Sequence, residues 1–170
     1  GGAVYHDLGN VNLTFIETAP RLPEFVTYLQ RTLDFLNSIG LMAKGGERLG
    51  IYLNGLKISG SAQCVHKNRV LYHCTLLYDT DLTALHKALN PELMVDDETL
   101  SSVYAVPSVR SEVTNIRSYL PEGTVTDFKE KAFQYFSKSQ SVSAFTGKEI
   151  EAVNQLREGK YIQKEWIYSR

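Results

Sequence analysis

Residues 51–77 read IYLNGLKISGSAQCVHKNRVLYHCTLL, and this stretch decides the fold of the chain. It begins with two short apolar segments, residues 49–53 and 56–62, joined at Asn54-Gly55, a strong signal for a two-residue hairpin turn. A further segment, residues 70–78, is almost continuously apolar or β-branched, as is typical of a central strand. The stretch therefore predicts three neighbouring strands of one sheet, the last of them central.

The flanking sequence predicts another strand and several helices. Residues 4–16 are rich in β-branched and aromatic residues and predict a strand. Residues 23–39 repeat apolar residues at helical spacing and end before Gly40, which predicts an amphipathic helix. Residues 44–47 contain two glycines and predict a loop. Strands interrupted by helices predict an α+β fold, with a mixed, largely antiparallel sheet flanked by helices.

The second half of the sequence is mostly helical in pattern. A short helix is expected to end at Leu89, capped by Thr80 or Asp81. Residues 126–138 predict a helix that buries Phe128, Ala132 and Phe136. A capping-box spacing at Thr146 and Glu149 predicts a final helix that ends at Gly159, with Ile150, Val153 and Leu156 facing inward. Residues 101–120 fit a strand, a short helix or both.

Composition limits the classes of partner. The chain has 170 residues, 43% of them hydrophobic, and a net charge of −1. This length predicts one domain, residues 1–170, and the charge provides no basic field for nucleic acid. No apolar run reaches the roughly twenty residues of a membrane span. Two cysteines, Cys64 and Cys74, fit reduced, cytoplasmic thiols. The chain starts at Gly1 without methionine, which suggests a fragment, a processed chain or missing upstream residues.

The opening residues Gly1, Gly2, Ala3, Val4 and Tyr5 form the first candidate site. Glycines allow close backbone approach and present N–H groups to a phosphate or carbonyl. A simple turn is the commoner reading of two glycines, and neither GxxxxGK[ST] nor GxGxxG is present.

His6 and Asp7 follow directly. Strand alternation would place their side chains on opposite faces, with Asp7 bonded to N–H groups of the glycine turn. A structural role and a ligand contact are equally open for His6. No second His or Cys lies at ligand spacing, so no protein-built metal site is predicted.

Lys57 is the most specific candidate for a catalytic residue. It lies between Leu56 and Ile58, where a charge is unusual in an apolar strand. It could reach solvent from an edge strand, or it could be a fixed cation that stabilises charge on a carbonyl and a phosphate. The following Gly60 and Ser61 allow close approach of a ligand backbone or phosphate.

His73 and Thr75 share one face of the predicted central strand. A histidine there is more often a hydrogen-bonded core residue than a catalyst. Cys64 and Cys74 lack an evident His or Asp partner, so both are interpreted as buried, inert thiols.

Several blocks together resemble the lipoate–protein ligase family, and they occur in the family's order. These blocks are GGAVYHDLGN from Gly1, KISGSA from Lys57, His73-x-Thr75-Leu76-Leu77, Leu89-Asn90-Pro91, and SVRSEVTN at residues 108–115. Lys160-Tyr161 and Trp166 are similar to the motif that closes the family's large domain. The chain is thus identified as a member of this family.

The resemblance implies a fold like the catalytic domains of biotin ligases and class II aminoacyl-tRNA synthetases. It implies activation of lipoate by Mg-ATP (ATP with Mg2+) to lipoyl-adenylate, then transfer to a lysine of a carrier. The carriers would be lipoyl domains of 2-oxoacid dehydrogenases and the glycine-cleavage H protein. Gly2, Ala3, Val4 and Tyr5 match the adenylate site, with Gly1 beside them. Lys57 matches the lysine that contacts carboxyl and phosphate groups, and His6 and His73, with Thr75, match the region of the lipoyl pocket.

The chain departs from the family pattern in four places. A paired-arginine segment, earlier strands and a C-terminal accessory domain are absent from the sequence as written. Glu47-Arg48-Leu49-Gly50 stands where many members have Arg-Asn-Asp, and Cys74 replaces a glycine. Two alternatives stay open: an ATP-independent octanoyl or lipoyl transferase acting through a cysteine acyl-enzyme, and a non-enzymatic lipoyl-binding relative.

Overall fold

The structure is a computed structural model that describes residues 4–18, 24–90, 111–138 and 141–167. The chain divides into two compact units, Gly1–Tyr135 and Phe136–Arg170, each described here by itself. The candidate residues Gly1, Gly2 and Ala3 lie outside the described residues.

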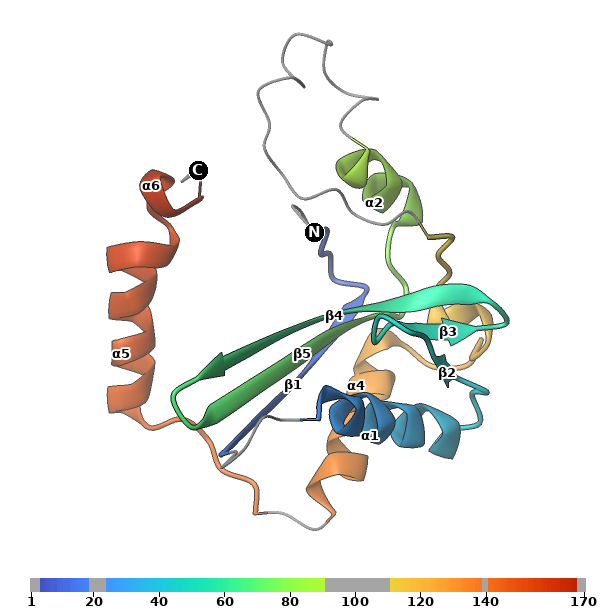
Figure 1. Ribbon diagram of the computed structural model, residues 1–170, viewed down its shortest axis with the longest axis horizontal. Helices are drawn as coiled ribbons and strands as arrows, with labels where there is room; N and C mark the ends of the chain where they lie inside the picture. The colour runs from blue at the N-terminus through green and yellow to red at the C-terminus, as the bar shows by residue number, and fades with distance from the viewer. Residues whose placement is uncertain (1–3, 19–23, 91–110, 139–140, 168–170) are drawn as a thin grey trace, which may run out of the picture. The chain divides into compact units, whose positions relative to one another are not determined.

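Within the described residues, five strands of the first unit form one antiparallel sheet in the order β1-β5-β4-β3-β2 (Figure 1). The central position of β5 between β1 and β4 confirms the prediction from its apolar sequence. Asn54 and Gly55 both have positive φ and join β3 to β4, as an Asn-Gly pair favours. The strands are β1 (Asn10–Thr18), β2 (Lys44–Gly45), β3 (Ile51–Leu53), β4 (Leu56–His66) and β5 (Arg69–Leu77).

Helices α1 (Phe25–Ser38) and α4 (Val125–Ser137) lie on one face of the sheet (Figure 1). Tyr28 of α1 stacks on Tyr72 of β5 with ring centroids 5.6 Å apart. Phe128 of α4 contacts the rings of Phe35 and Tyr78, with centroids 5.5 and 4.8 Å away. The core therefore sits between these two helices and one face of the sheet, and the fold class is confirmed as α+β.

Two shorter elements follow β5. Asp81 caps α2 (Leu82–Leu89), because its side chain accepts the N–H groups of Thr83 and Ala84. A short 3-10 helix, η2 (Ile116–Ser118), lies within the stretch that fitted strand or helix, and Val113 before it forms an isolated parallel bridge with Lys57. The described part of this stretch therefore contains a short helix and a single bridge rather than a strand.

The second unit contains α5 (Gly147–Leu156), the π-helical turn η3 (Arg157–Tyr161) and α6 (Lys164–Ile167). The capping box at Thr146 and Glu149 is present as predicted. The predicted stop at Gly159 is wrong, since Gly159 lies inside η3. The inward orientation predicted for Ile150, Val153 and Leu156 is also wrong, because each is more than half exposed. Helical periodicity identifies an apolar stripe but not what covers it.

Candidate functional site

A β-bulge in β4 sets the direction of the Lys57 side chain. Ile51 pairs with Ser59, but Tyr52 pairs with Lys57, so β4 has one extra residue between these pairs. Ser59 and Ile51 are buried on the face covered by α1. Because Tyr52 alternates away from Ile51, its partner Lys57 shares the opposite face. Without the extra residue, Lys57 would share the face of Ser59.

The lysine side chain is half-buried and lies beside a small group of neighbours. A Cβ added to Gly50 would lie 3.3 Å from the Lys57 Cε and 3.2 Å from the Tyr52 ring, so the lysine stem runs over Gly50. Among the residues that the structure describes, no hydrogen bond or ion pair involves the Lys57 ammonium. The cation is thus held by packing of its stem and is available to an anion.

Polar side chains line the face of the sheet opposite α1, which we call the open face. Thr75 is paired with Asn12 of β1 and with Gly60 of β4, so these three residues form one row across the sheet. Thr14, His73 and Ala62 form the next row. A Cβ at Gly60 would meet no atom of the described residues within 4 Å, so space remains above this row.

His73 is hydrogen-bonded through both ring nitrogens. Its Nδ1 lies 3.1 Å from the Thr14 hydroxyl and its Nε2 lies 3.2 Å from the Thr75 hydroxyl. Thr75 in turn donates to the Asn12 side-chain oxygen at 2.8 Å. The prediction that His73 and Thr75 share a face is confirmed. Asn12 and Thr14 were missed, although the alternation of β1 placed them on one face.

Burial lowers the pKa of His73, and the nearby His6 lowers it further. Desolvation disfavours the charged imidazole, and a second imidazole adds repulsion when both are protonated. His6 is exposed and Val4 is 81% exposed, while Tyr5 is half-buried. The structure therefore brings His6 toward His73 but leaves Val4 without a packed position.

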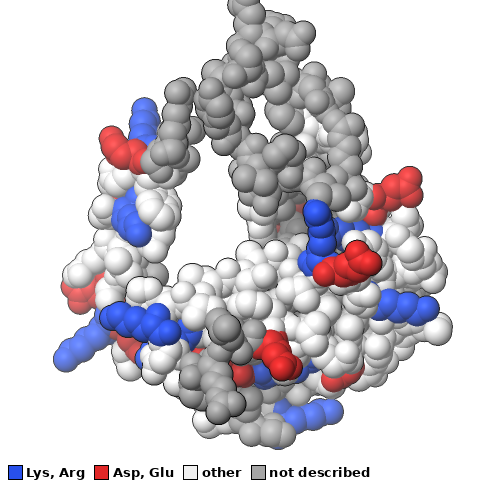
Figure 2. Space-filling view, in the orientation of Figure 1, with Lys and Arg blue, Asp and Glu red and all other residues white. Residues whose placement is uncertain are grey.

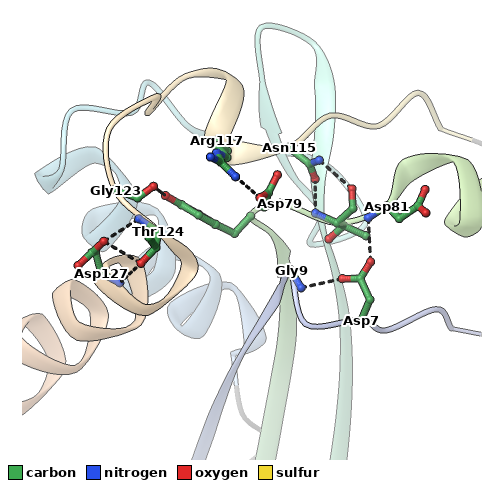
Figure 3. Close-up of polar contacts among 11 residues, drawn as sticks. Asp7, Gly9, Asp79, Asp81, Asn115, Arg117, Gly123, Thr124 and Asp127 are labelled. Atoms are coloured by element: carbon green, nitrogen blue, oxygen red, sulfur yellow. Dashed lines mark hydrogen bonds and ion pairs between the residues drawn. The ribbon is translucent and has the colours of Figure 1, made fainter.

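Asp7 connects the segment before β1 to the turn after β5 by hydrogen bonds (Figure 3). Its two carboxylate oxygens accept the backbone N–H groups of Gly9 and Asp81, each at 2.8 Å. A Cβ on Gly9 would lie 2.0 Å from the Asp79 carbonyl oxygen, so only glycine allows this approach. The predicted strand alternation of His6 and Asp7 is wrong, since β1 begins at Asn10. The glycine turn that was expected to donate to Asp7 lies outside the described residues.

Lys57 and this segment meet at the same end of the sheet. Asn10 is paired with Leu77, so β1 begins where β5 ends. Ser59 is paired with Leu76, so β4 also begins at that end, just after Lys57. The geometry therefore places the Lys57 ammonium, which has no ion-pair partner within the described ranges, and the loop that follows the glycine stretch at one end of the open face.

The two cysteines differ, and the prediction that both are buried is half wrong. Cys74 is buried against α1, and burial raises the pKa of its thiol to about 11. Cys64 is exposed near the far end of β4. A thiol with a raised pKa is a poor nucleophile, so Cys74 is a core residue.

Charged side chains of both signs are mixed on the surface. On the face shown in Figure 2, Lys and Arg side chains lie scattered among Asp and Glu, so a ligand there meets individual cations rather than a basic patch. In the described part of the chain, no three His, Cys, Asp or Glu side chains gather in a way that could hold a metal ion. None of the helices described has the length and apolarity to cross a membrane.

Residues 1–137 match a family model described as the lipoyl protein ligase A/B catalytic domain. The chain belongs to this family. It is similar to "Probable lipoate-protein ligase A" of Mycoplasma pneumoniae, with 37% identity over 82% of this chain and 41% of that protein. It is 30% identical to lipoate-protein ligase LplJ of Bacillus subtilis over its whole length and 52% of the relative. The chain thus spans about half the length of the curated relatives it matches.

Solved structures of lipoyl protein ligases share the fold. A bipartite lipoate protein ligase from Thermoplasma acidophilum, studied with its E2 lipoyl domain, matches with a TM-score of 0.75 and 27% identity. The match covers 98% of this chain and 66% of that chain. A lipoate-protein ligase A bound with ATP matches in fold with a TM-score of 0.73 and 24% identity, over 96% of this chain and 66% of the other.

Proposed function

We propose that the protein carrying this chain is an ATP-dependent lipoate–protein ligase. It would activate lipoate to lipoyl-adenylate and transfer the lipoyl group to a lysine of a carrier domain. Membership of the lipoyl protein ligase family supports the reaction class. The observation that carries the proposal is Lys57, a cation without an ion-pair partner in the described residues, turned by a β-bulge onto the open face.

The first step joins two anions. A carboxylate oxygen of lipoate forms a bond to the α-phosphorus of ATP, and the bond from that phosphorus to the pyrophosphate oxygen breaks. Negative charge on the carboxylate and on the α-phosphate must approach each other. A fixed ammonium between them, as proposed for Lys57, lowers this repulsion and stabilises the transition state by about 3–4 kcal/mol.

The second step releases AMP. The nitrogen of the carrier lysine bonds to the acyl carbon, the bond from that carbon to the AMP oxygen breaks, and the amine proton leaves to solvent. The same Lys57 ammonium would polarise the acyl carbonyl and balance the charge left on AMP. Because the cation is already held by its stem over Gly50, little reorganisation is needed during either step.

The other binding residues are proposed from the family motifs that they match. Val4 and Tyr5 would line the adenylate site together with Gly1, Gly2 and Ala3, and His6 would lie near the lipoyl pocket. His73 and Thr75 would contact the lipoyl group on the open face, where the space above Gly60 admits a ligand. Asn12 and Thr14 would hold His73 and Thr75 in place through their hydrogen bonds.

Substrates and partners follow from the reaction. Mg2+ would enter as part of Mg-ATP, with the triphosphate rather than a cluster of protein carboxylates as its main ligand. The carriers would be lipoyl domains of 2-oxoacid dehydrogenases and the glycine-cleavage H protein. The two free cysteines support a cytoplasmic setting.

Lipoate-dependent exchange of pyrophosphate into ATP by the intact protein tests this proposal. The Lys57→Met variant should lose about 10²–10³-fold in exchange rate, because one preorganised charge is removed. Lys67→Met, in the turn between β4 and β5, is the matched control and should keep the wild-type rate. Full exchange by Lys57→Met would contradict the role of the lysine.

The same preparation separates the alternatives. Lipoate binding without any pyrophosphate exchange would indicate a non-enzymatic lipoyl-binding protein. Mass spectrometry after incubation with an octanoyl carrier and no ATP would detect an acyl thioester. A thioester on the exposed Cys64 would favour the acyl-enzyme transferase instead.

A further inference from the structure

Residues 112–117 connect the Lys57 strand to the turn after β5. At one end of the segment, the Lys57 N–H donates to the Glu112 carbonyl oxygen at 2.8 Å. The Thr114 N–H donates back to the Lys57 carbonyl oxygen at 3.0 Å. Both peptide groups of Lys57 are therefore held on this side by the segment, close to the bulge that sets its side-chain direction.

Asn115 makes the next connection, to the turn after β5. Its side-chain oxygen accepts the Thr80 N–H at 3.0 Å, and its side-chain nitrogen donates to the Thr80 carbonyl oxygen at 2.9 Å (Figure 3). The amide thus pairs with one residue as a neighbouring strand would, using one donor and one acceptor. Thr80 is buried, so loss of either bond would leave a backbone group unsatisfied.

The turn then holds the segment that follows the glycine stretch. The Asp81 N–H, next to Thr80, donates to Asp7 at 2.8 Å. The N–H groups of Tyr78 and Asp79 both donate to the Gly9 carbonyl oxygen, at 3.1 and 3.0 Å. A continuous series of hydrogen bonds therefore runs from the Lys57 peptide through Asn115 to Asp7 and Gly9.

We infer that Asn115 is a positioning residue that sets the distance between the Lys57 ammonium and the segment Tyr5–Gly9, which follows the glycine stretch proposed to bind the adenylate. This inference rests on the proposed ligase function. The transition state needs the ammonium between the carboxyl and phosphate groups, and a displacement of about 1 Å can cost about 10²-fold in rate. The Asn115 amide joins the Lys57-bearing part of this series to buried Thr80 through two hydrogen bonds, whereas the side chain of Arg117 joins the same segment to Asp79 through an exposed ion pair.

The Asn115 amide both donates and accepts, so a substitution can remove one of its two hydrogen bonds and keep the other. Asn115→Asp keeps an oxygen that accepts the Thr80 N–H, but it loses the donor and places a carboxylate oxygen opposite the Thr80 carbonyl oxygen. Asn115→Ala removes both bonds. Arg117→Gln is the matched control, because Arg117 lies in the same segment and its side chain makes only an exposed ion pair with Asp79.

Kinetics of pyrophosphate exchange by the intact protein give the first test. Both Asn115 variants should lower kcat about 10–10²-fold while the KM for lipoate changes less than about threefold, since a displaced Lys57 acts on the transition state. Arg117→Gln should keep its kcat. Unchanged kcat in the Asn115 variants would overturn the inference, and so would variants that fail to fold, because Asn115 would then serve stability alone.

Amide hydrogen exchange gives a test that does not need activity. In the folded Asn115 variants, the amides of Lys57, Thr114, Asp81 and Gly9 should exchange faster, while the amides of α1 keep their wild-type rates. Uniform acceleration across α1 and these amides would indicate global destabilisation and would also overturn the inference. If the wild-type protein shows no lipoate-dependent exchange of pyrophosphate, the proposed function fails, whereas hydrogen exchange still reports on the connection through Asn115.

Discussion

The two faces of the β-sheet differ in chemistry although they come from alternate residues of the same strands. On the face covered by α1, Tyr72 and Cys74 are fully buried and pack with Tyr28. On the open face, His73 and Thr75 from the same strand bond to Thr14 and Asn12. A single period-two pattern therefore places neighbouring residues on separate faces, one packed in the core and one that is proposed to contact the ligand.

Substitution of two adjacent residues, one on each face, tests most strongly whether the two faces have different roles. Tyr72→Ala should lower the free energy of unfolding by about 3–5 kcal/mol, because it removes a fully buried ring. His73→Ala, one residue along and on the other face, should cost less than about 1 kcal/mol in stability but lower lipoate-dependent exchange about tenfold. Urea denaturation monitored by circular dichroism, together with the exchange assay, measures both. Equal stability losses would show that the faces are not divided in this way.

A second pair of variants compares two glycines. Gly9→Ala should destabilise the protein by about 1–3 kcal/mol, since the added methyl group would strike the Asp79 backbone. The methyl group added by Gly60→Ala would meet open space, so stability should change by less than about 1 kcal/mol. A ligand bound over the open face should bind less tightly to this variant. Thermal unfolding and lipoate titration of the intact proteins test the pair. A Gly60→Ala variant with wild-type affinity would argue against a ligand over that row.

The smallest expected effect is a pH dependence of stability that comes from His73. Its pKa in the folded protein is lowered, so the unfolded chain binds the proton more readily. The folded state therefore has its full stability above a pH of about 6.5, the pKa of an unfolded histidine. This contribution of His73 to stability is lost as the pH falls through its lowered pKa in the folded protein. His73→Gln should therefore lose less stability than the wild type between pH 7.5 and 5. Identical pH profiles would mean that His73 is not desolvated.

The sequence predicted the β3–β4 hairpin, the position of β5 between two strands and the capping box because these depend on local signals. Asn54-Gly55, the apolar run of β5 and the capping box at Thr146 are each sufficient for their element. The direction of Lys57 was not predictable, since a β-bulge leaves no fixed signature in a short strand. Strict alternation from Ser59 would have turned the lysine toward α1.

Long-range contacts account for the remaining misses. Asn115 bonds to Thr80, which is 35 residues away, and no spacing rule links the two. Thr14 and His73 are 59 residues apart, so their bond depended on a strand register that the sequence did not give. The apolar stripe of α5 is a different kind of miss. Its helical periodicity predicted burial, but its side chains are more than half exposed among the described residues.

In the proposed mechanism, Lys57 and the open face bind the acyl-adenylate. A crystal structure of the intact protein with a non-hydrolysable lipoyl-adenylate analogue tests it most directly. We expect the Lys57 ammonium within about 2.7–3.1 Å of the analogue's carbonyl or phosphate-equivalent oxygen, with the lipoyl chain over His73 and Thr75. An analogue bound elsewhere, with the Lys57 ammonium directed into bulk water, would contradict it.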